Sequence, residues 1–295
     1  MRFALLVTTL GREAEMRRLL TSLSAQTCQD FHVYVGDQSN GSLSALWAAF
    51  GDRLPMTVLP MDSKGVSAAR NVLLRACAAD SWDIAAFPDD DCWYPPDLLA
   101  RMGAWFAGHS GADALLTGWR TGPKTGPKSD PKSESKPESG AGSGVEAGAV
   151  SSQPEQVSLY GAFRRAETYV QFYRRAAVER IGCWDESLGP GTGLPWGCGE
   201  DTDYLLRALR AGLYIVRDTA LTVYHPAVRL TPPNAPRWRA YGRGRMYLLH
   251  KHGLPLWFRL ANIVYPLLCM LKEHPRNWRY RWHMFCGRLG GWAGS

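Results

Sequence analysis

Short apolar runs alternate with helical patterns through the first hundred residues. Four runs are bounded by polar or turn residues: Phe3–Val7, Phe31–Val35, Met56–Leu59 and Ile84–Phe87. Between the first two runs, and again between the last two, apolar side chains recur every three or four residues, as on the buried face of a helix. Such uninterrupted runs are typical of strands buried on both faces of a sheet. The pattern predicts an open α/β fold with a mostly parallel central sheet flanked by helices, in which ligands bind at the carboxyl ends of the strands.

The composition changes abruptly between residues 121 and 156. This stretch is rich in Gly, Pro, Lys, Ser and Glu, and its first large apolar residue is Val145. A segment with so little apolar surface cannot offset the entropy lost on ordering, so we expect a disordered insertion over 121–156. The alternative is a tether or a partner-binding segment.

Helix and strand patterns resume after the insertion. A helix is expected around Arg174–Ile181 and another over Asp203–Ala211, where leucines recur on one face and Gly212 follows as a C-cap. Short strands are expected at Tyr214–Val216 and Leu221–Tyr224.

The C-terminal region, 229–295, is basic and aromatic. It holds twelve Lys or Arg and one acid, a charge of +11, which leaves −4 for residues 1–228 within the total of +7. Its apolar segment, 254–271, contains two prolines and Arg259, which disfavour a membrane-spanning helix. We divide the chain into an α/β domain, 1–228, and a helical tail that contacts an anionic membrane surface peripherally or packs on that domain.

The cysteines and the N-terminus bear on the cellular compartment. The seven cysteines are scattered and never spaced as C-x-x-C, which suggests neither a disulfide framework nor a zinc site. The apolar run that begins at Phe3 is too short for the apolar region of a signal peptide. We therefore expect a cytoplasmic protein.

Three consecutive carboxylates, Asp89, Asp90 and Asp91, follow the fourth apolar run. In an extended segment Asp89 and Asp91 face the same way, so both could bind one hard divalent cation. The alternative is that the three acids end the strand or cap a helix expected near Asp97–Phe106. Repulsion between adjacent like charges favours the cation.

A second acidic pair, Glu200-Asp201, directly follows the glycine-rich stretch 189–199. A carboxylate there could act as general base on a substrate hydroxyl, although acids in the first turn of a helix also interact favourably with the helix dipole. His225 follows the last expected strand, either as a metal ligand or as a hydrogen-bonded structural residue.

Five motifs carry a family resemblance. They are TTLGR near the N-terminus, GDQSNG at 36–41, SKGVSAARN at 63–71, FPDDDCWYPPD at 87–97 and GCGEDTDYLLRAL at 197–209. In this order and spacing the chain resembles the family 2 glycosyltransferases, which have the GT-A fold, over about residues 1–120 and 157–228. The first motif departs from the family's usual Pro-Thr-Tyr-Asn pattern, which leaves the contributions of Thr9 and Arg12 open.

The resemblance implies a metal-dependent sugar transfer. Asp89 and Asp91 would hold Mn²⁺ or Mg²⁺ against the diphosphate of a nucleotide sugar, and His225 would complete the metal site. Asp201 would be the base. The implied mechanism is inverting: the base deprotonates an acceptor hydroxyl, whose oxygen attacks the anomeric carbon while the metal stabilises the departing nucleoside diphosphate.

The resemblance also implies which side chains meet the two substrates. The donor residues would be Thr8 and Thr9 in the base pocket, Asp37 at the base or ribose, Arg70 near the nucleotide or its phosphates, and Asp89 and Asp90. For the acceptor we expect Glu200 and the glycine-rich loop with Trp196, because glycine permits close backbone approach and an aromatic face packs against a sugar ring. An ordinary flexible connection is the alternative for the loop.

The expected reaction moves a sugar from a nucleotide-sugar donor, a UDP-sugar before others, to a glycan or polyprenyl-linked acceptor in polysaccharide or cell-envelope biosynthesis. The place expected for it is the inner face of the plasma membrane. Two other classes compete. A nucleic-acid-binding module would use the basic tail but leaves the acidic clusters without a role, so no nucleic-acid partner is expected. A sugar nucleotidyltransferase would require a glycine-rich nucleotide-binding loop directly after the first strand, but only Gly11 lies there.

Overall fold

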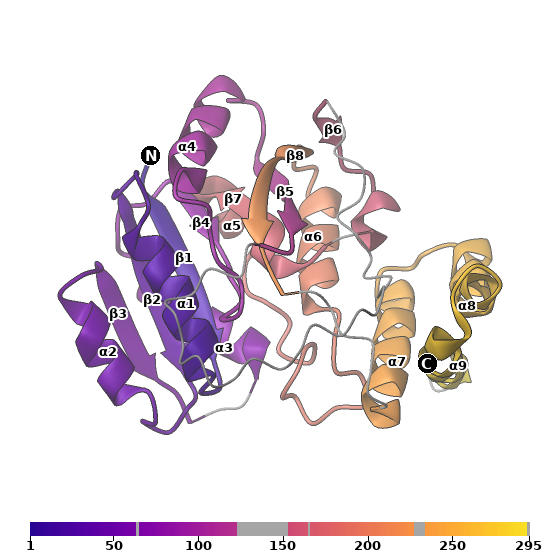
Figure 1. The fold of residues 1–295 in the computed structure, drawn as a ribbon. Helices are drawn as coiled ribbons and strands as arrows, with labels where there is room; N and C mark the ends of the chain where they lie inside the picture. The colour runs from indigo at the N-terminus through magenta and orange to yellow at the C-terminus, as the bar shows by residue number, and fades with distance from the viewer. Residues whose placement is uncertain (63–64, 123–152, 165, 227–233, 294–295) are drawn as a thin grey trace.

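One mixed sheet organises the chain (Figure 1). The computed structural model describes residues 1–62, 65–122, 153–164, 166–226 and 234–293. The strands are β1 (Phe3–Thr9), β2 (Phe31–Asp37), β3 (Met56–Pro60), β4 (Ile84–Ala86), β5 (Ala114–Arg120), β6 (Glu155–Gln156), β7 (Gln171–Arg174) and β8 (Ile215–Tyr224). They lie in the order β3-β2-β1-β4-β7-β5-β8-β6.

Helices cover both faces of this sheet and continue beyond it at the C-terminus (Figure 1). The α-helices are α1 (Glu13–Ser24), α2 (Ser44–Gly51), α3 (Val66–Ala76), α4 (Leu98–Gly108), α5 (Arg175–Ile181), α6 (Glu200–Arg210), α7 (Ala235–Lys251), α8 (Leu256–Met270) and α9 (Trp278–Ala293). Short 3-10 turns are η1 (Gly161–Phe163), η2 (Thr168–Val170) and η3 (Pro275–Asn277).

The four apolar runs form β1 to β4. β1 pairs in parallel with β2 and β4, and β2 with β3, which confirms the predicted α/β sheet. Along β1, Phe3, Leu5 and Val7 pack into one core layer, and Ala4 and Leu6 into the layer on the other face. Burial on both faces removes any need for polar alternation, so these strands are continuous apolar runs in the sequence.

Besides β5, for which no strand was expected, the elements α2 and β7 were not predicted from the sequence. The helix α2 consists almost wholly of apolar and small residues, SALWAAFG, so no polar face marks a helical period. The strand β7 lies antiparallel between β4 and β5 although its sequence, QFYR, lacks an apolar run. Gln171 is fully buried there because its amide donates to the carbonyl of Ala166 and accepts from the hydroxyl of Tyr173.

The region after the insertion differs from expectation in two respects. The strands predicted at Tyr214–Val216 and Leu221–Tyr224 are one strand, β8, whose pairing with β5 shifts register after Thr117. The insertion predicted over 121–156 falls mostly outside the described residues, but its last two residues form β6. Backbone pairing of Glu155–Gln156 with β8 stabilises that short strand, a contribution that composition does not show.

The described part of the tail, 234–293, forms three α-helices, and α7 lies between the sheet domain and the pair α8 and α9 (Figure 1). The packing of α7 on α9 is close because glycines line it. A Cβ on Gly242 would lie 2.6 Å from the carbonyl oxygen of Met284 and 2.8 Å from the amide nitrogen of Arg288. In the described part of the chain, no helix has the length and apolarity needed to cross a membrane.

We expect Gly242→Ala to lower the free energy of unfolding by about 1–3 kcal/mol, because the added methyl group must push α9 away from α7. The control is Gly290→Ala on α9, where the added Cβ would lie 3.8 Å from the nearest atom, Nε of Arg243. Both changes raise helix propensity, so their difference isolates the clash. Equal stability of the two variants in chemical denaturation would contradict this description of the interface.

Candidate active site

The polar residues singled out from the sequence gather at the carboxyl ends of the central strands. Thr9 ends β1, and Thr8 forms a bridge with Asp89, which follows β4. His225 follows β8, while Glu200 begins α6. The crossover connections of an open α/β sheet bring these distant segments to one edge.

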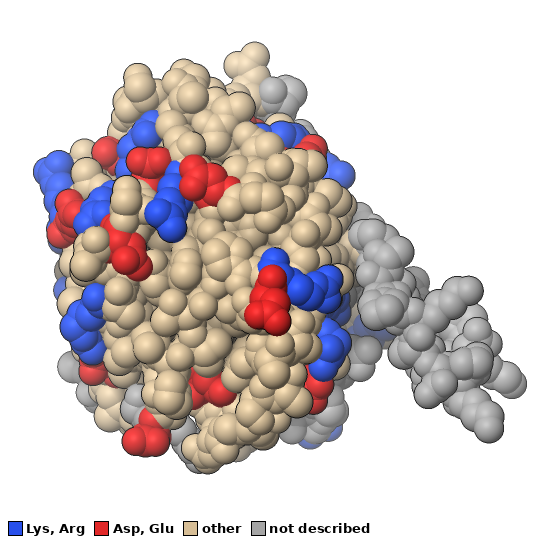
Figure 2. All heavy atoms as spheres, turned by 90° about the vertical axis from the view of Figure 1, so that its left-hand side faces the viewer, with Lys and Arg blue, Asp and Glu red and all other residues tan. Residues whose placement is uncertain are grey.

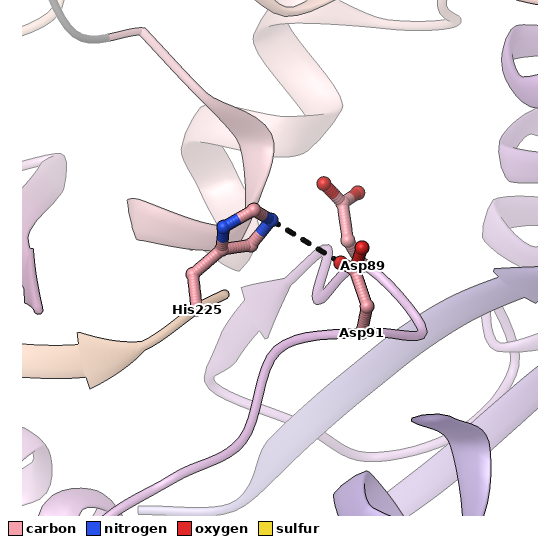
Figure 3. A group of neighbouring side chains, drawn as sticks. All are labelled: Asp89, Asp91 and His225. Carbon is pink, nitrogen blue, oxygen red and sulfur yellow. Dashed lines mark ion pairs between the residues drawn. The ribbon is translucent and has the colours of Figure 1, made fainter. Parts of the chain in front are cut away.

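Asp89, Asp91 and His225 lie together (Figure 3), each offering one ligand atom within 4.8 Å of the others. Nε2 of His225 is 3.2 Å from Oδ1 of Asp91, and Nδ1 of His225 is 2.7 Å from the carbonyl oxygen of Pro226. Because a carbonyl only accepts, Nδ1 carries the proton in this arrangement. A neutral ring then turns the lone pair of Nε2 toward a carboxylate oxygen, a repulsive contact unless a proton or a cation lies between them.

Two carboxylates and one imidazole form a donor set that suits Mn²⁺ or Mg²⁺. The imidazole is held for this role by aromatic neighbours. Its ring stacks on Tyr169, with centroids 4.3 Å apart, and meets Trp119 at 73°. The residues of this cluster therefore fit a divalent cation in both chemistry and orientation.

The electrostatics of the cluster follow from burial and from neighbouring charges. Burial raises the pKa of Asp89, and the charge of Arg70 offsets this only in part. Burial acts in the same direction on Asp91, but the hydrogen bond and charge of His225, together with Arg12, lower its pKa to about 2. Burial alone would lower the pKa of His225, yet its interaction with Asp91 outweighs burial and raises it.

Asp90 is bound by residues of the TTLGR segment, Thr9 and Arg12. Its carboxylate accepts from the hydroxyl of Thr9 at 2.7 Å and pairs with the guanidinium of Arg12, which also reaches Asp91 at 2.7 Å. Asp90 is 3% exposed, so its charge is used inside the protein to hold the TTLGR segment. This gives Arg12 the role that the sequence left open.

Arg70 links the cluster of Asp89, Asp91 and His225 to the second acidic pair, Glu200-Asp201. Its guanidinium donates to Thr168 at 2.9 Å and to Asp89 at 3.3 Å, and lies 3.7 Å from Glu200. It also lies over the ring of Trp184, 4.7 Å from the centroid. Thr168 and Trp184 could not be predicted as members of this site, because neither belongs to a recognised motif.

Glu200 and Asp201 sit in the first turn of α6, behind Gly199, whose φ is +106°. Burial raises the pKa of both carboxyl groups, and mutual repulsion adds to the effect at Glu200. One oxygen of Asp201 accepts from the amide of Thr202 at 2.6 Å. A carboxylate with a raised pKa accepts protons more readily than an ordinary one, which suits a general base.

The residues predicted for the nucleotide base lie at the ends of β1 and β2. Asp37 is 5% exposed and accepts from the amide of Ser39 and the indole of Trp47, each at 2.8 Å. These contacts fix its carboxylate and leave each oxygen one further acceptor site. Thr8 is half-buried beside Gly36.

The glycine-rich loop is packed against α7 and is not a free connection. Trp196 stacks on Tyr247 with centroids 4.4 Å apart, and its indole donates to the carbonyl of Ser187 at 2.8 Å. A Cβ on Gly199 would lie 2.7 Å from the side chain of Leu248. One face of the Trp196 ring is therefore occupied by the tail.

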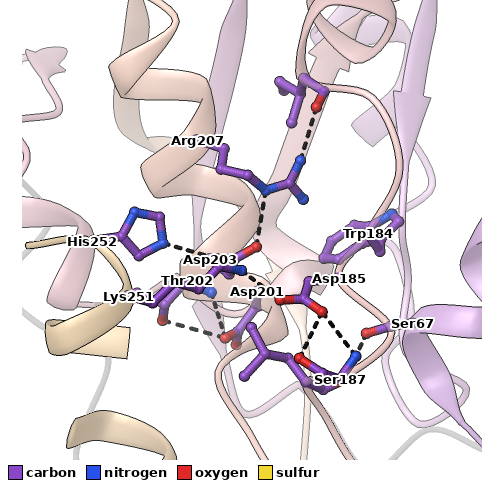
Figure 4. Close-up of polar contacts among 12 residues, drawn as sticks. Ser67, Trp184, Asp185, Ser187, Asp201, Thr202, Asp203, Arg207, Lys251 and His252 are labelled. Atoms are coloured by element: carbon purple, nitrogen blue, oxygen red, sulfur yellow. Dashed lines mark hydrogen bonds and ion pairs between the residues drawn. The ribbon is translucent and has the colours of Figure 1, made fainter. Parts of the chain in front are cut away.

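A buried network anchors α6 to the end of α7 (Figure 4). Asp203, 0% exposed, accepts from His252 at 2.8 Å, Lys251 at 2.6 Å and Arg207 at 2.9 Å. Lys251 also pairs with Asp185 at 2.6 Å. Burial would raise the pKa of Asp203, but the hydrogen bonds from His252 and Lys251 lower it to about 2.

Solved structures share this architecture. The mannosyltransferase PcManGT from Pyrobaculum calidifontis, in complex with GDP-Man and Mn²⁺, superposes with a TM-score of 0.67 at 15% identity over 100% of this chain and 88% of its own. S. aureus TarS 1-349 in complex with UDP-GlcNAc gives 0.61 at 15% identity over 98% and 92%, and a longer TarS chain is covered to 55%. The fold is therefore that of the GT-A glycosyltransferases, as the sequence predicted.

The sequence comparisons identify the family. The model of glycosyl transferase family 2 matches residues 4–181, more than half of the chain, and the chain belongs to this family. The succinoglycan biosynthesis protein ExoW of Rhizobium meliloti (strain 1021) is 38% identical over 89 residues. That match spans 28% of this chain and only 27% of ExoW.

We expect Asp203→Asn to lower the free energy of unfolding by about 2 kcal/mol at pH 7, because three donors lose their charged acceptor. The folded-state pKa is depressed, so this stability is present above pH ~4 and is lost as the pH falls toward 2. Denaturation across this window should show the two proteins converging at low pH. Asp97→Asn, which removes an exposed pair with Arg101, is the control and should change little. A gap that persists unchanged at low pH would refute the assignment.

Proposed function

We propose that this chain transfers a sugar, with inversion at the anomeric carbon, from a nucleoside diphosphate donor to an acceptor hydroxyl. The observation that carries the proposal is the continuous polar path from the Asp89, Asp91 and His225 cluster, through Arg70, to the acidic pair that contains Asp201. A diphosphate bound at this cluster would lie beside a carboxylate able to act as base. Membership of family 2 supports the same reaction class.

The donor would bind across the carboxyl ends of β1, β2 and β4. A divalent cation, Mn²⁺ or Mg²⁺, when bound by Asp89, Asp91 and His225, would neutralise the charge of the diphosphate. Thr8, Thr9 and Asp37 would line the base and ribose pocket, with a UDP-sugar as the first candidate. Support comes from the two solved structures, which hold UDP-GlcNAc in TarS and GDP-Man with Mn²⁺ in PcManGT.

Arg70 would act near the phosphates through Asp89. Its side chain is 3% exposed and already donates to Thr168 and Asp89, so we assign it the task of orienting that carboxylate and moderating the charge of Glu200. A buried guanidinium fixed by several partners can do this without reorganising during the reaction.

On the acceptor side, Asp201 would remove the proton from the attacking hydroxyl. Glu200 and the loop with Trp196 would form the acceptor pocket, with the occupied face of Trp196 setting the position of the ring. We assign the acceptor to the glycans or polyprenyl-linked saccharides of polysaccharide and cell-envelope biosynthesis, which ExoW supports by its name. The reaction would take place in the cytoplasm, at the inner face of the plasma membrane.

The test is a screen of nucleotide sugars for transfer and hydrolysis with Mn²⁺, Mg²⁺ or chelator. Asp201→Asn should lower kcat about 10²- to 10⁴-fold with little change in donor binding, because it removes the base alone. In the active protein kcat should fall as the pH drops below about 6, where Asp201 becomes protonated.

Asp52→Asn, a change of the same kind at an exposed acid far along the chain, serves as the control and should retain full activity. Full activity of Asp201→Asn would exclude it as the base. Turnover that chelator leaves unaffected would exclude the cation.

A further inference from the structure

The outer faces of α8 and α9 carry an apolar surface that has no partner in the described structure. Among the residues that the structure describes, ten of the fifteen exposed large apolar side chains lie between Leu256 and Leu289. On α8, Leu256, Leu260, Val264 and Leu268 recur every fourth residue, with exposed fractions between 45% and 60%. This helix therefore turns its apolar stripe outward, the reverse of the usual arrangement on a soluble domain.

The stripe continues onto α9 with aromatic side chains. Trp278 and Trp282 are 44% and 49% exposed, one helical turn apart. At the junction of the two helices they line a shallow hollow of about 340 Å³ together with Met270, Arg279 and His283. Indole rings beside a guanidinium are typical of the boundary between lipid headgroups and acyl chains.

The charge of the tail indicates which kind of partner binds this apolar surface. Residues 234–293 hold eleven Lys or Arg and one acid, and Lys272, Arg276 and Arg279 are exposed beside the apolar stripe. The far side of the molecule, around α2 and β3, carries acidic and basic side chains interspersed (Figure 2). Five of these eleven cations lie on α7 and Arg288 is buried, so the outer face of α8 and α9 itself offers the three exposed ones. A face with this net positive charge repels a second copy of itself and attracts an anionic surface.

We propose that the outer face of α8 and α9 docks on an anionic lipid bilayer, with the two helices lying in the plane of the headgroups. The helix α7 separates this face from the active site and contacts the loop before Asp201. In this orientation the acceptor side of the active site would lie within about two helix diameters, roughly 20 Å, of the lipid. The inference deepens the proposed function, on which it rests for the lipid-linked acceptor alone.

The experiment is co-sedimentation of the full chain, without nucleotide sugar, with vesicles of phosphatidylcholine alone or mixed with phosphatidylglycerol. The protein should bind the mixed vesicles, more weakly at high salt, and the neutral ones far less. The triple variant Leu260→Ser, Val264→Ser and Leu268→Ser should bind the mixed vesicles about 100-fold more weakly. Tyr214→Ser, a polar change at an exposed aromatic of the sheet domain, should bind as the unchanged protein does.

Donor hydrolysis without vesicles checks that the triple variant is folded. Because vesicle binding is measured without donor, a failure to bind vesicles can be distinguished from a failure of the proposed sugar transfer. Equal binding by the triple variant and the unchanged protein would overturn the proposal, as would no binding to anionic vesicles. Equilibrium sedimentation showing a dimer that the triple variant dissociates would assign the face to a second copy instead.

Discussion

Negative charge concentrated at the end of β4 is the constraint on which the rest of the site depends. Three consecutive carboxylates are buried there to different degrees, and each has a cationic partner from another part of the chain. Arg12 holds Asp90 and Asp91, while Arg70 holds Asp89. His225 completes the balance and brings the end of β8 to the same place. Much of the active-site geometry therefore follows from the need to balance the negative charge of these three carboxylates.

The second organising feature is the link between the tail and α6, the helix that carries the proposed base. Lys251 and His252, at the end of α7, bind Asp203 two residues after the proposed base. Leu248 packs on the glycine that begins the same helix. The tail is therefore part of the framework that positions Asp201, and a surface bound by α8 and α9 would lie close to the acceptor.

The sequence was a sound guide where one physical signal dominated. The parallel strands were predictable because burial on both faces leaves long apolar runs, and five motifs were enough to identify the family and the GT-A fold. The structure brings Asp89, Asp91 and His225 together, as the resemblance implied. The helix α2 was not predictable because its sequence has no polar face, and β7 was not because its burial depends on partners distant in sequence. For the same reason the partners of Asp90, Thr168 and Trp184 could not be read from local pattern, and the occupied face of Trp196 became evident only from its packing on Tyr247.

The central claim is that Asp89, Asp91 and His225 form a site for a divalent cation. Electron paramagnetic resonance of Mn²⁺ bound with UDP tests it most directly, since imidazole coordination gives a nitrogen hyperfine coupling that carboxylates cannot. We predict one bound Mn²⁺ with this coupling in the unchanged protein, and its loss in His225→Gln. Bound Mn²⁺ that lacks the nitrogen coupling, or that shows it equally in His225→Gln, would contradict the account.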